Sequence, residues 1–305
     1  MANSAAHSEQ RAHAAQRRLR LGLVVLLAVG ATIATCLIVH NRRHAPPQTP
    51  GDSELLRSLP RMNASTGFAT SHECRECHPQ EYASWHASYH RKMTQVAGPD
   101  SIFGPFDGIE VRDADQVHRL VRKGDEFWVQ TLHGPAGARP LPPGEETWRR
   151  VVMTTGAHHM QVYWTPGGNG NRLRELPLVY ILDARPGKSR WAPLEASYLS
   201  PSAPGAAAQT CWNKDCILCH ATGGRPGTDA NATAANTKVA EVGIACEACH
   251  GPAERHVRLN RDRAAKSTPS ALGTSDEGLV NPARLRPERA AQVCGHCHAL
   301  ASFMT

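Results

Sequence analysis

The 305-residue sequence is poor in the side chains that fill ordinary protein interiors, apart from one apolar run near its N-terminus. Aromatic residues make up 5% of the chain, whereas glycine and proline contribute 25 and 22 residues. This composition excludes a large conventional aliphatic core and predicts many loops. Something other than aliphatic side chains must therefore fill much of the interior.

The sequence also lacks any cluster of lysine and arginine interleaved with aromatic residues, although its formal charge is +7. A nucleic-acid interface requires such a basic patch, so we expect no nucleic-acid partner. Basic residues instead flank the apolar run, at Arg17 to Arg20 and at Arg42 to Arg43.

The apolar run, Leu21 to Val39, contains no charged residue. As a helix it would extend about 28 Å, which is close to the thickness of a bilayer core. More basic residues precede the run than directly follow it, which favours a cytoplasmic N-terminus. We therefore predict a cytoplasmic N-terminus over 1–20, a transmembrane signal-anchor over 21–40 and a linker over 41–61. A cleaved signal peptide is the alternative interpretation.

Local patterns beyond the linker indicate both helices and strands. A helix is predicted within Ser71 to Met93, because Pro79 suits a first helical turn and aromatic residues follow at helical spacing. A hairpin is predicted from Val117 to Val129, and further strands at 148–154, 160–164 and 176–182. From Ser200 onward the sequence shows little periodic hydrophobicity. We predict a mainly α and irregular domain over 62–305, with a small β-containing insertion within 79–199, preceded by one transmembrane helix.

Four segments of the chain follow the pattern Cys-x-x-Cys-His, which is typical of covalent haem c attachment. Two thiols one helical turn apart can form thioethers with the two vinyl groups of a haem, and the adjacent imidazole then lies under the iron. Paired zinc sites or thioredoxin-like chemistry are alternatives, but neither explains a histidine after each pair. We predict four haem c groups. The attachment cysteines are Cys74, Cys77, Cys216, Cys219, Cys246, Cys249, Cys294 and Cys297, and the proximal histidines are His78, His220, His250 and His298.

Each haem iron has a sixth coordination position, and the ligand there separates electron carriers from catalysts. We predict His90, which ends a helical pattern, His256, which follows a Gly-Pro break, and one of the pair His158 and His159, with His158 preferred. His86 is the alternative to His90. The histidines available beyond the linker are His72, His86, His90, His118, His133, His158, His159, His256 and His296.

Sulfur-bearing residues offer further alternatives for the sixth position. Met93 and Met160 could bind iron, although the abundance of histidine favours pairs of imidazoles. Cys211 precedes the second motif, and it could be a ligand, a redox-active thiol or a buried structural residue.

The sequence resembles the multihaem cytochromes of the cytochrome c-554 type. The residues that carry the resemblance are Cys74 to Pro79 with Trp85, Ser88 and His90, Gly156 to Gln161, and Cys246 to Pro252 with His256. The resemblance implies distal ligands at His90, near His158 and at His256, and closely packed haem pairs that pass electrons. It also implies that one haem can remain five-coordinate. Relatives continue beyond the residue matching His298, so we expect this chain to be a truncated product or a fragment.

Haem attachment to cysteine requires an exported chain, which agrees with the predicted topology. We expect a tetrahaem c-type cytochrome anchored in the bacterial inner membrane, with its domain in the periplasm. It would carry electrons between respiratory redox partners, such as a quinol-linked donor and a periplasmic oxidoreductase. The alternative is a multihaem oxidoreductase with one open haem that acts on a small nitrogen or sulfur compound. The sequence shows no clear acid-base constellation, so no catalytic residue is assigned.

Overall fold

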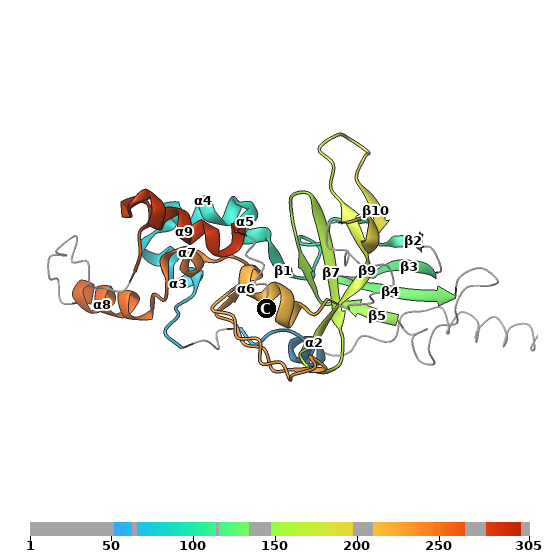
Figure 1. Cartoon of the computed structure of the whole chain (residues 1–305), viewed down its shortest axis with the longest axis horizontal. Helices are drawn as coiled ribbons and strands as arrows, with labels where there is room; N and C mark the ends of the chain where they lie inside the picture. Colours follow the sequence, from blue (N-terminus) through green and yellow to red (C-terminus); the bar gives the residue numbers. More distant parts are fainter. Residues whose placement is uncertain are drawn as a thin grey trace, which may run out of the picture. The chain divides into compact units, whose positions relative to one another are not determined.

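The computed structural model describes residues 52–62, 66–113, 116–133, 148–197, 210–265 and 279–299 (Figure 1). The chain divides into two units, Met1–Gln48 and Thr49–Thr305, and every described residue lies in the second. The predicted cytoplasmic N-terminus and transmembrane segment lie outside the described residues, as does the first half of the predicted linker. Within the described ranges, no helix has the length and hydropathy needed to cross a membrane.

A five-stranded antiparallel sheet forms the centre of the described fold. Its order is β1–β6–β7–β9–β10, with bounds Thr94–Val96, Met153–Thr155, Met160–Pro166, Leu173–Ile181 and Arg190–Pro193. β7 is buried along nearly its whole length, and apart from Gln161 and Thr165 it is a run of apolar and aromatic residues. Such a run is typical of a strand that is covered on both faces of its sheet.

A second sheet contains four antiparallel strands in the order β2–β3–β4–β5. Their bounds are Asp107–Asp113, Gln116–Lys123, Glu126–His133 and Trp148–Val151. The predicted hairpin is confirmed, with Lys123 opposite Glu126. Gly124 turns the chain there with a φ of 60°, in the left-handed region that glycine adopts readily.

Two clusters of buried side chains cover the two faces of the five-stranded sheet. Between the sheets, Leu120 and Val129 pack with Tyr163 and Leu178 among others. On the opposite face, the cluster includes Trp164 from β7 together with Trp212 and Ile217 from the segment that leads into the second Cys-x-x-Cys-His motif. The central sheet is therefore the scaffold against which the second motif is fixed.

The helices are short, and each of the four motifs lies wholly or largely within one. The motif helices are α3 (Ser71–Cys77), α6 (Ile217–His220), α7 (Cys246–His250) and α9 (Pro287–His298). Figure 1 shows α3, α4, α7 and α9 gathered together. The other elements are α2 (Asp52–Ser58), α4 (Pro79–Ala87), α5 (Tyr89–Lys92), β8 (Asn169–Gly170), η1 (Leu194–Ala196), η2 (Trp212–Cys216), β11 (Ala221–Thr222), β12 (Ala234–Ala235), β13 (Glu241–Val242), α8 (Glu254–Ala265) and η3 (Pro282–Arg284).

The prediction of a mainly α and irregular domain with a small β-containing insertion is wrong. The described chain contains two substantial antiparallel sheets as well as two small strand pairs, and both buried clusters are built on the large sheets. The strands themselves lie close to the predicted segments. The prediction underestimated how much of the fold these strands make up. Neighbouring residues of β7 such as Val162 and Tyr163 pack into two different buried clusters, one on each face of the sheet. A local sequence pattern does not reveal that both faces of one sheet are covered.

Candidate haem-binding site

The four Cys-x-x-Cys-His motifs lie next to one another although they are spread along the sequence. The thiols of Cys74 and Cys246 hydrogen-bond to each other. Cys249 and Cys294 are close enough to interact electrostatically, and the Sγ of Cys297 lies 4.0 Å from the carbonyl oxygen of Cys219. The first motif therefore adjoins the third, and the second adjoins the fourth.

These contacts change the acidity of the motif thiols. The hydrogen bond from Cys74 lowers the pKa of Cys246 to about 6 and correspondingly raises the pKa of Cys74. Burial raises the pKa of Cys216 to about 12 and that of Cys297 to about 11. Cys246 is thus the thiol most readily ionised among these four, and the thiolate is the reactive form of cysteine.

Two of the proximal histidines face a second histidine. The ring centres of His78 and His256 are 6.4 Å apart, and those of His90 and His298 are 6.3 Å apart. A histidine nitrogen binds a metal at about 2 Å and the ring centre lies about 1.1 Å farther, so two histidines on opposite sides of one iron have ring centres roughly 6.3 Å apart. Both pairs therefore have the spacing that one haem iron between them requires.

A helix break gives His90 its position. α4 ends at Ala87, Ser88 adopts an extended conformation, and its hydroxyl accepts a hydrogen bond of 3.4 Å from the backbone N–H of Arg91 in the next short helix, α5. The indole N–H of Trp85 donates to the carbonyl oxygen of Ile244 at 2.8 Å. His90 thus leaves the helix that carries His86, and the alternative ligand His86 instead lies against Tyr82.

His256 is placed by the turn after the third motif. Gly251 has a φ of 81°, which ends α7 and redirects the chain. Ala253 is buried, and the backbone N–H of Glu254 donates to the carbonyl oxygen of Gly67 at 3.1 Å, just before α3. The predicted Gly-Pro break is therefore present, and it directs His256 toward the first motif.

The other two proximal histidines have different surroundings. The Nδ1 of His250 lies 2.7 Å from the carbonyl oxygen of Val280, which suits donation from this nitrogen and leaves Nε2 for a metal. Burial lowers the pKa of His220, which favours the neutral imidazole that binds iron. His256 packs against His78, and His90 packs against His298. Within the described part of the chain, no aromatic or imidazole ring packs in this way against His220 or His250.

The structure does not place the preferred candidate His158 opposite a proximal histidine in the described ranges. Its ring centre is 4.4 Å from that of Tyr89 and 4.0 Å from that of His159. Its role as a ligand remains a prediction. His118 is fully buried in β3 beside Thr131, and burial lowers its pKa to about 4, which fits a structural residue.

Cys211 is buried at the start of the π-helix that leads into the second motif. Its thiol lies 3.7 Å from the amide oxygen of Asn213, and its backbone N–H donates to Asp215 at 2.8 Å. These contacts agree with the interpretation of Cys211 as a structural residue beside the second motif.

The donor groups and their surroundings fit haem. Cys77, Cys249 and Cys294 are exposed in the polypeptide alone. Two large apolar side chains beside the motifs are exposed as well, with fractions of 61% for Leu218 and 55% for Tyr89. A bound porphyrin would cover such groups, because it presents an extended apolar surface next to its thioether bonds.

Sequence reasoning missed two supporting features. Arg261 forms ion pairs with Glu73 and Glu76. Glu247, inside the third motif, is buried, and its Oε1 accepts hydrogen bonds from the backbone N–H groups of Ala69 at 2.8 Å and Ala253 at 2.7 Å. Burial raises the pKa of Glu247 to about 7. The basic residues repeated along α8 were the sequence signal that could have indicated the ion pairs of Arg261. No sequence signal indicated the burial of Glu247.

A family profile matches two stretches of the chain. The family is described as cytochrome c554 and c-prime, and the match covers residues 73–101 and 194–251. These stretches contain the first three Cys-x-x-Cys-His motifs and His90. The two stretches together make up less than half of the chain, so the chain is similar to this family over the parts that carry these motifs.

Two solved structures are similar to this chain. One is the outer cell wall cytochrome OcwA, with 19% identity, a TM-score of 0.43, and coverage of 76% of this chain and 37% of that chain. Another is an undecahaem cytochrome from the S-layer of Carboxydothermus ferrireducens, with 17% identity, a TM-score of 0.41, and coverage of 79% and 27%. The chain thus spans well under half the length of each. No curated protein matches it.

Proposed function

We propose that the chain is a tetrahaem electron carrier in which His256 and His90 are the sixth ligands of the first and fourth haems. We further propose that residues 21–40 anchor it in the bacterial inner membrane with 62–305 in the periplasm. There it would exchange electrons between a quinol-linked donor and a periplasmic oxidoreductase.

One observation carries the proposal: each of the two outermost motifs in the sequence has a second imidazole at the spacing that a shared iron requires, 6.4 Å for His78 and His256 and 6.3 Å for His90 and His298. An iron with two strong imidazole ligands is low-spin and has no vacant position for substrate. This arrangement favours electron transfer over catalysis at both sites.

The residues of the chain hold and orient the cofactors. Haem c, when bound, supplies a one-electron couple between ferric and ferrous iron. The eight motif cysteines fix its position, the four proximal histidines bind iron, and the carbonyl of Val280 orients His250. The contacts between the motifs would bring the attachment sites of the first and third haems next to each other, and likewise those of the second and fourth haems.

The test is electron paramagnetic resonance of the haem-loaded full chain, combined with a pyridine haemochrome assay of haem content. We expect four haems per chain, with at least two low-spin signals typical of paired imidazoles. The signals lost in His256→Ala and His90→Ala should belong to two different haems. If both variants kept all of their low-spin signals, the proposed ligation would be excluded.

A second candidate function is an oxidoreductase with one open haem. It is favoured by the second and third motifs, because no other imidazole ring packs against His220 or His250 in the described part of the chain. Carbon monoxide and nitrite distinguish the two functions. A high-spin haem that binds either molecule in the unaltered chain would favour the oxidoreductase, whereas four low-spin haems inert to both would exclude it.

A further inference from the structure

We propose that Arg261 is a positioning residue that holds helix α8, and with it His256, against the first haem motif. The inference rests on the proposed ligation of the first haem by His78 and His256. It adds a residue that touches neither the iron nor the porphyrin attachment cysteines. It also explains how a helix with little packing can present a ligand at a fixed position.

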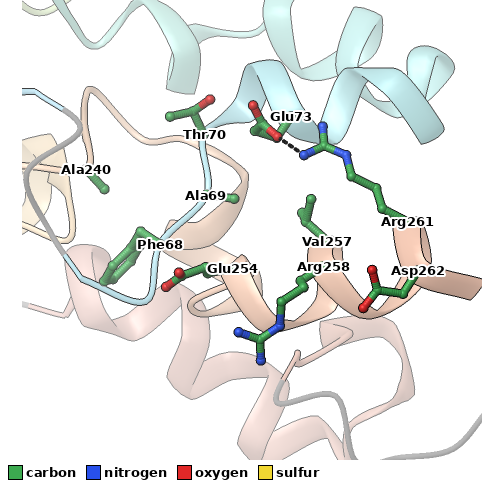
Figure 2. A pocket seen from close by; sticks show the side chains of 10 residues that line it. All are labelled: Phe68, Ala69, Thr70, Glu73, Ala240, Glu254, Val257, Arg258, Arg261 and Asp262. Atoms are coloured by element: carbon green, nitrogen blue, oxygen red, sulfur yellow. Dashed lines mark ion pairs between the residues drawn. The ribbon is translucent and has the colours of Figure 1, made fainter.

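Helix α8 has little to hold it by packing. None of its twelve residues, Glu254–Ala265, is buried. A pocket of about 470 Å³ lies under one of its faces (Figure 2). The pocket wall on the helix includes Val257 and Arg258, and the facing segment includes Phe68 and Thr70. The apolar contact between α8 and the segment before α3 is therefore incomplete, and it cannot by itself fix the helix.

Arg261 connects α8 to the first motif directly. One guanidinium nitrogen lies 2.6 Å from a carboxylate oxygen of Glu73, and another lies 2.5 Å from one of Glu76. Figure 2 shows the first of these pairs at the edge of the pocket. Glu73 and Glu76 stand on α3 on either side of Cys74, and Glu76 lies inside the first motif. One side chain thus joins the helix of the distal histidine to that of the proximal histidine.

The position of Arg261 along α8 makes this contact important for His256. The helix is tied at its start, where the N–H of Glu254 donates to Gly67. Arg261 lies about 7.5 Å farther along the axis than His256, at 1.5 Å per residue. His256 therefore lies between two attachments. If the second is removed, α8 keeps its attachment beside the Gly251 turn, and rotation of the helix about that turn would move the imidazole away from His78.

A single pair between exposed charges is weak, but one guanidinium that joins two carboxylates of the same helix forms a small network with fixed geometry. We expect the network to shift the equilibrium between bound and detached His256 by roughly three- to tenfold. Since the neighbouring charges are half exposed, the effect should be visible as a minor high-spin population and not as unfolding.

The experiment compares Arg261→Gln with Arg258→Gln in the haem-loaded full chain. Arg258 is the matched control: it is an exposed arginine on the same helix and the same pocket wall, and the described residues give it no ion pair. The readouts are the high-spin fraction in electron paramagnetic resonance and the fraction of haem that binds carbon monoxide. Hydrogen exchange along α8 reports its attachment independently of the haem.

We expect Arg261→Gln to increase the carbon monoxide-binding fraction about three- to tenfold and to accelerate exchange in the second half of α8. The double variant Glu73→Gln/Glu76→Gln should show the same changes as Arg261→Gln. Arg261→Lys keeps the positive charge, so its carbon monoxide-binding fraction should lie between those of the unaltered chain and Arg261→Gln. An unaltered spectrum in Arg261→Gln, or an equal change in Arg258→Gln, would overturn the inference.

A His256→Ala variant separates the two proposals. If it makes the first haem high-spin while Arg261→Gln does not, the ligation is correct and the positioning role of Arg261 is wrong. If His256→Ala leaves the spectrum unchanged, the ligation itself is wrong, and the inference falls with it.

Discussion

The imidazole rings of His90 and His298 face each other with their centres 6.3 Å apart, although one follows the first motif and the other ends the fourth. This relationship predicts that His90 serves the fourth haem and not the first, to which it is closer in sequence. His90→Ala should therefore convert one low-spin haem to a high-spin form that binds carbon monoxide, as seen by electron paramagnetic resonance.

The fourth haem can be removed to identify the one affected. A Cys294→Ala/Cys297→Ala chain cannot attach the fourth haem. In that chain, His90→Ala should not reduce the number of low-spin haems any further. His86→Ala is the matched control, since His86 lies four residues earlier on α4, and it should leave the spectrum unaltered. If His90→Ala still produced a high-spin haem in the chain without the fourth attachment site, the pairing of His90 with His298 would be refuted.

The motifs and most strands could be predicted from the sequence because both depend on local spacing. Val117 to Val121 and Phe127 to Val129 are rich in β-branched and aromatic residues, and they lie within β3 and β4. The pairing of His90 with His298 could not be predicted, since it depends on how distant helices pack. The break at Ser88 decides which way His90 points, and only its capping of the Arg91 N–H reveals that break.

The size of the β-structure was underestimated for a related physical reason. Periodicity shows that a strand has a buried face, but it does not show what covers it. Trp212 and Ile217 lie in a segment with little apolar periodicity, yet both are fully buried against the central sheet. The sequence around Trp212 and Ile217 looks like a spacer between cysteines. Its local pattern gives no sign of burial, because the strands that cover these two side chains lie elsewhere in the chain.

Glu247 predicts a pH dependence of stability. Its pKa is raised to about 7 by burial, above the value of about 4.3 expected in the unfolded chain. The folded state therefore binds the proton more tightly, so its contribution to stability is complete below the unfolded pKa and is lost as the pH rises toward 7. Glu247→Gln keeps an acceptor for Ala69 and Ala253 but cannot ionise. We expect it to increase the free energy of unfolding at pH 8 by about 1–3 kcal/mol and to have little effect at pH 4.5.

Urea unfolding of the haem-loaded chain between pH 4.5 and pH 8 measures this difference. Glu254→Gln is the control, because Glu254 is an exposed carboxylate near the same turn, and its curve should follow that of the unaltered chain. Parallel curves for the unaltered chain and Glu247→Gln across the whole range would show that Glu247 does not titrate as expected.

Asn213 joins the central sheet to the segment of the second motif. Its amide oxygen accepts a hydrogen bond of 2.7 Å from the backbone N–H of Leu173, and its amide nitrogen donates to the carbonyl of Asn171 and the hydroxyl of Thr237. The residue is fully buried. Asn213→Ala would leave these partners unsatisfied away from water, so we expect a loss of about 2–4 kcal/mol in the free energy of unfolding.

Urea denaturation measures the loss, with Asn231→Ala as the control. Asn231 is an exposed asparagine in the loop after β11, and its replacement should change stability by less than about 0.5 kcal/mol. Similar small effects from both variants would mean that the Asn213 hydrogen bonds are replaced by other partners.

Gly156 fixes the turn that precedes His158 and His159. Its backbone N–H donates to the carbonyl oxygen of Met93 at 2.7 Å, and its φ is 97°. A Cβ at this position would lie 2.2 Å from the carbonyl oxygen of Met160, which is backbone and cannot move aside easily. Gly187 has a similar φ of 68° but open space around its Cα. Gly187→Ala should therefore lose about 1 kcal/mol through backbone strain alone, whereas Gly156→Ala should lose roughly 3 kcal/mol or more in urea unfolding. Equal losses would show that strain, and not the close approach of Met160, is the reason glycine is needed at the turn.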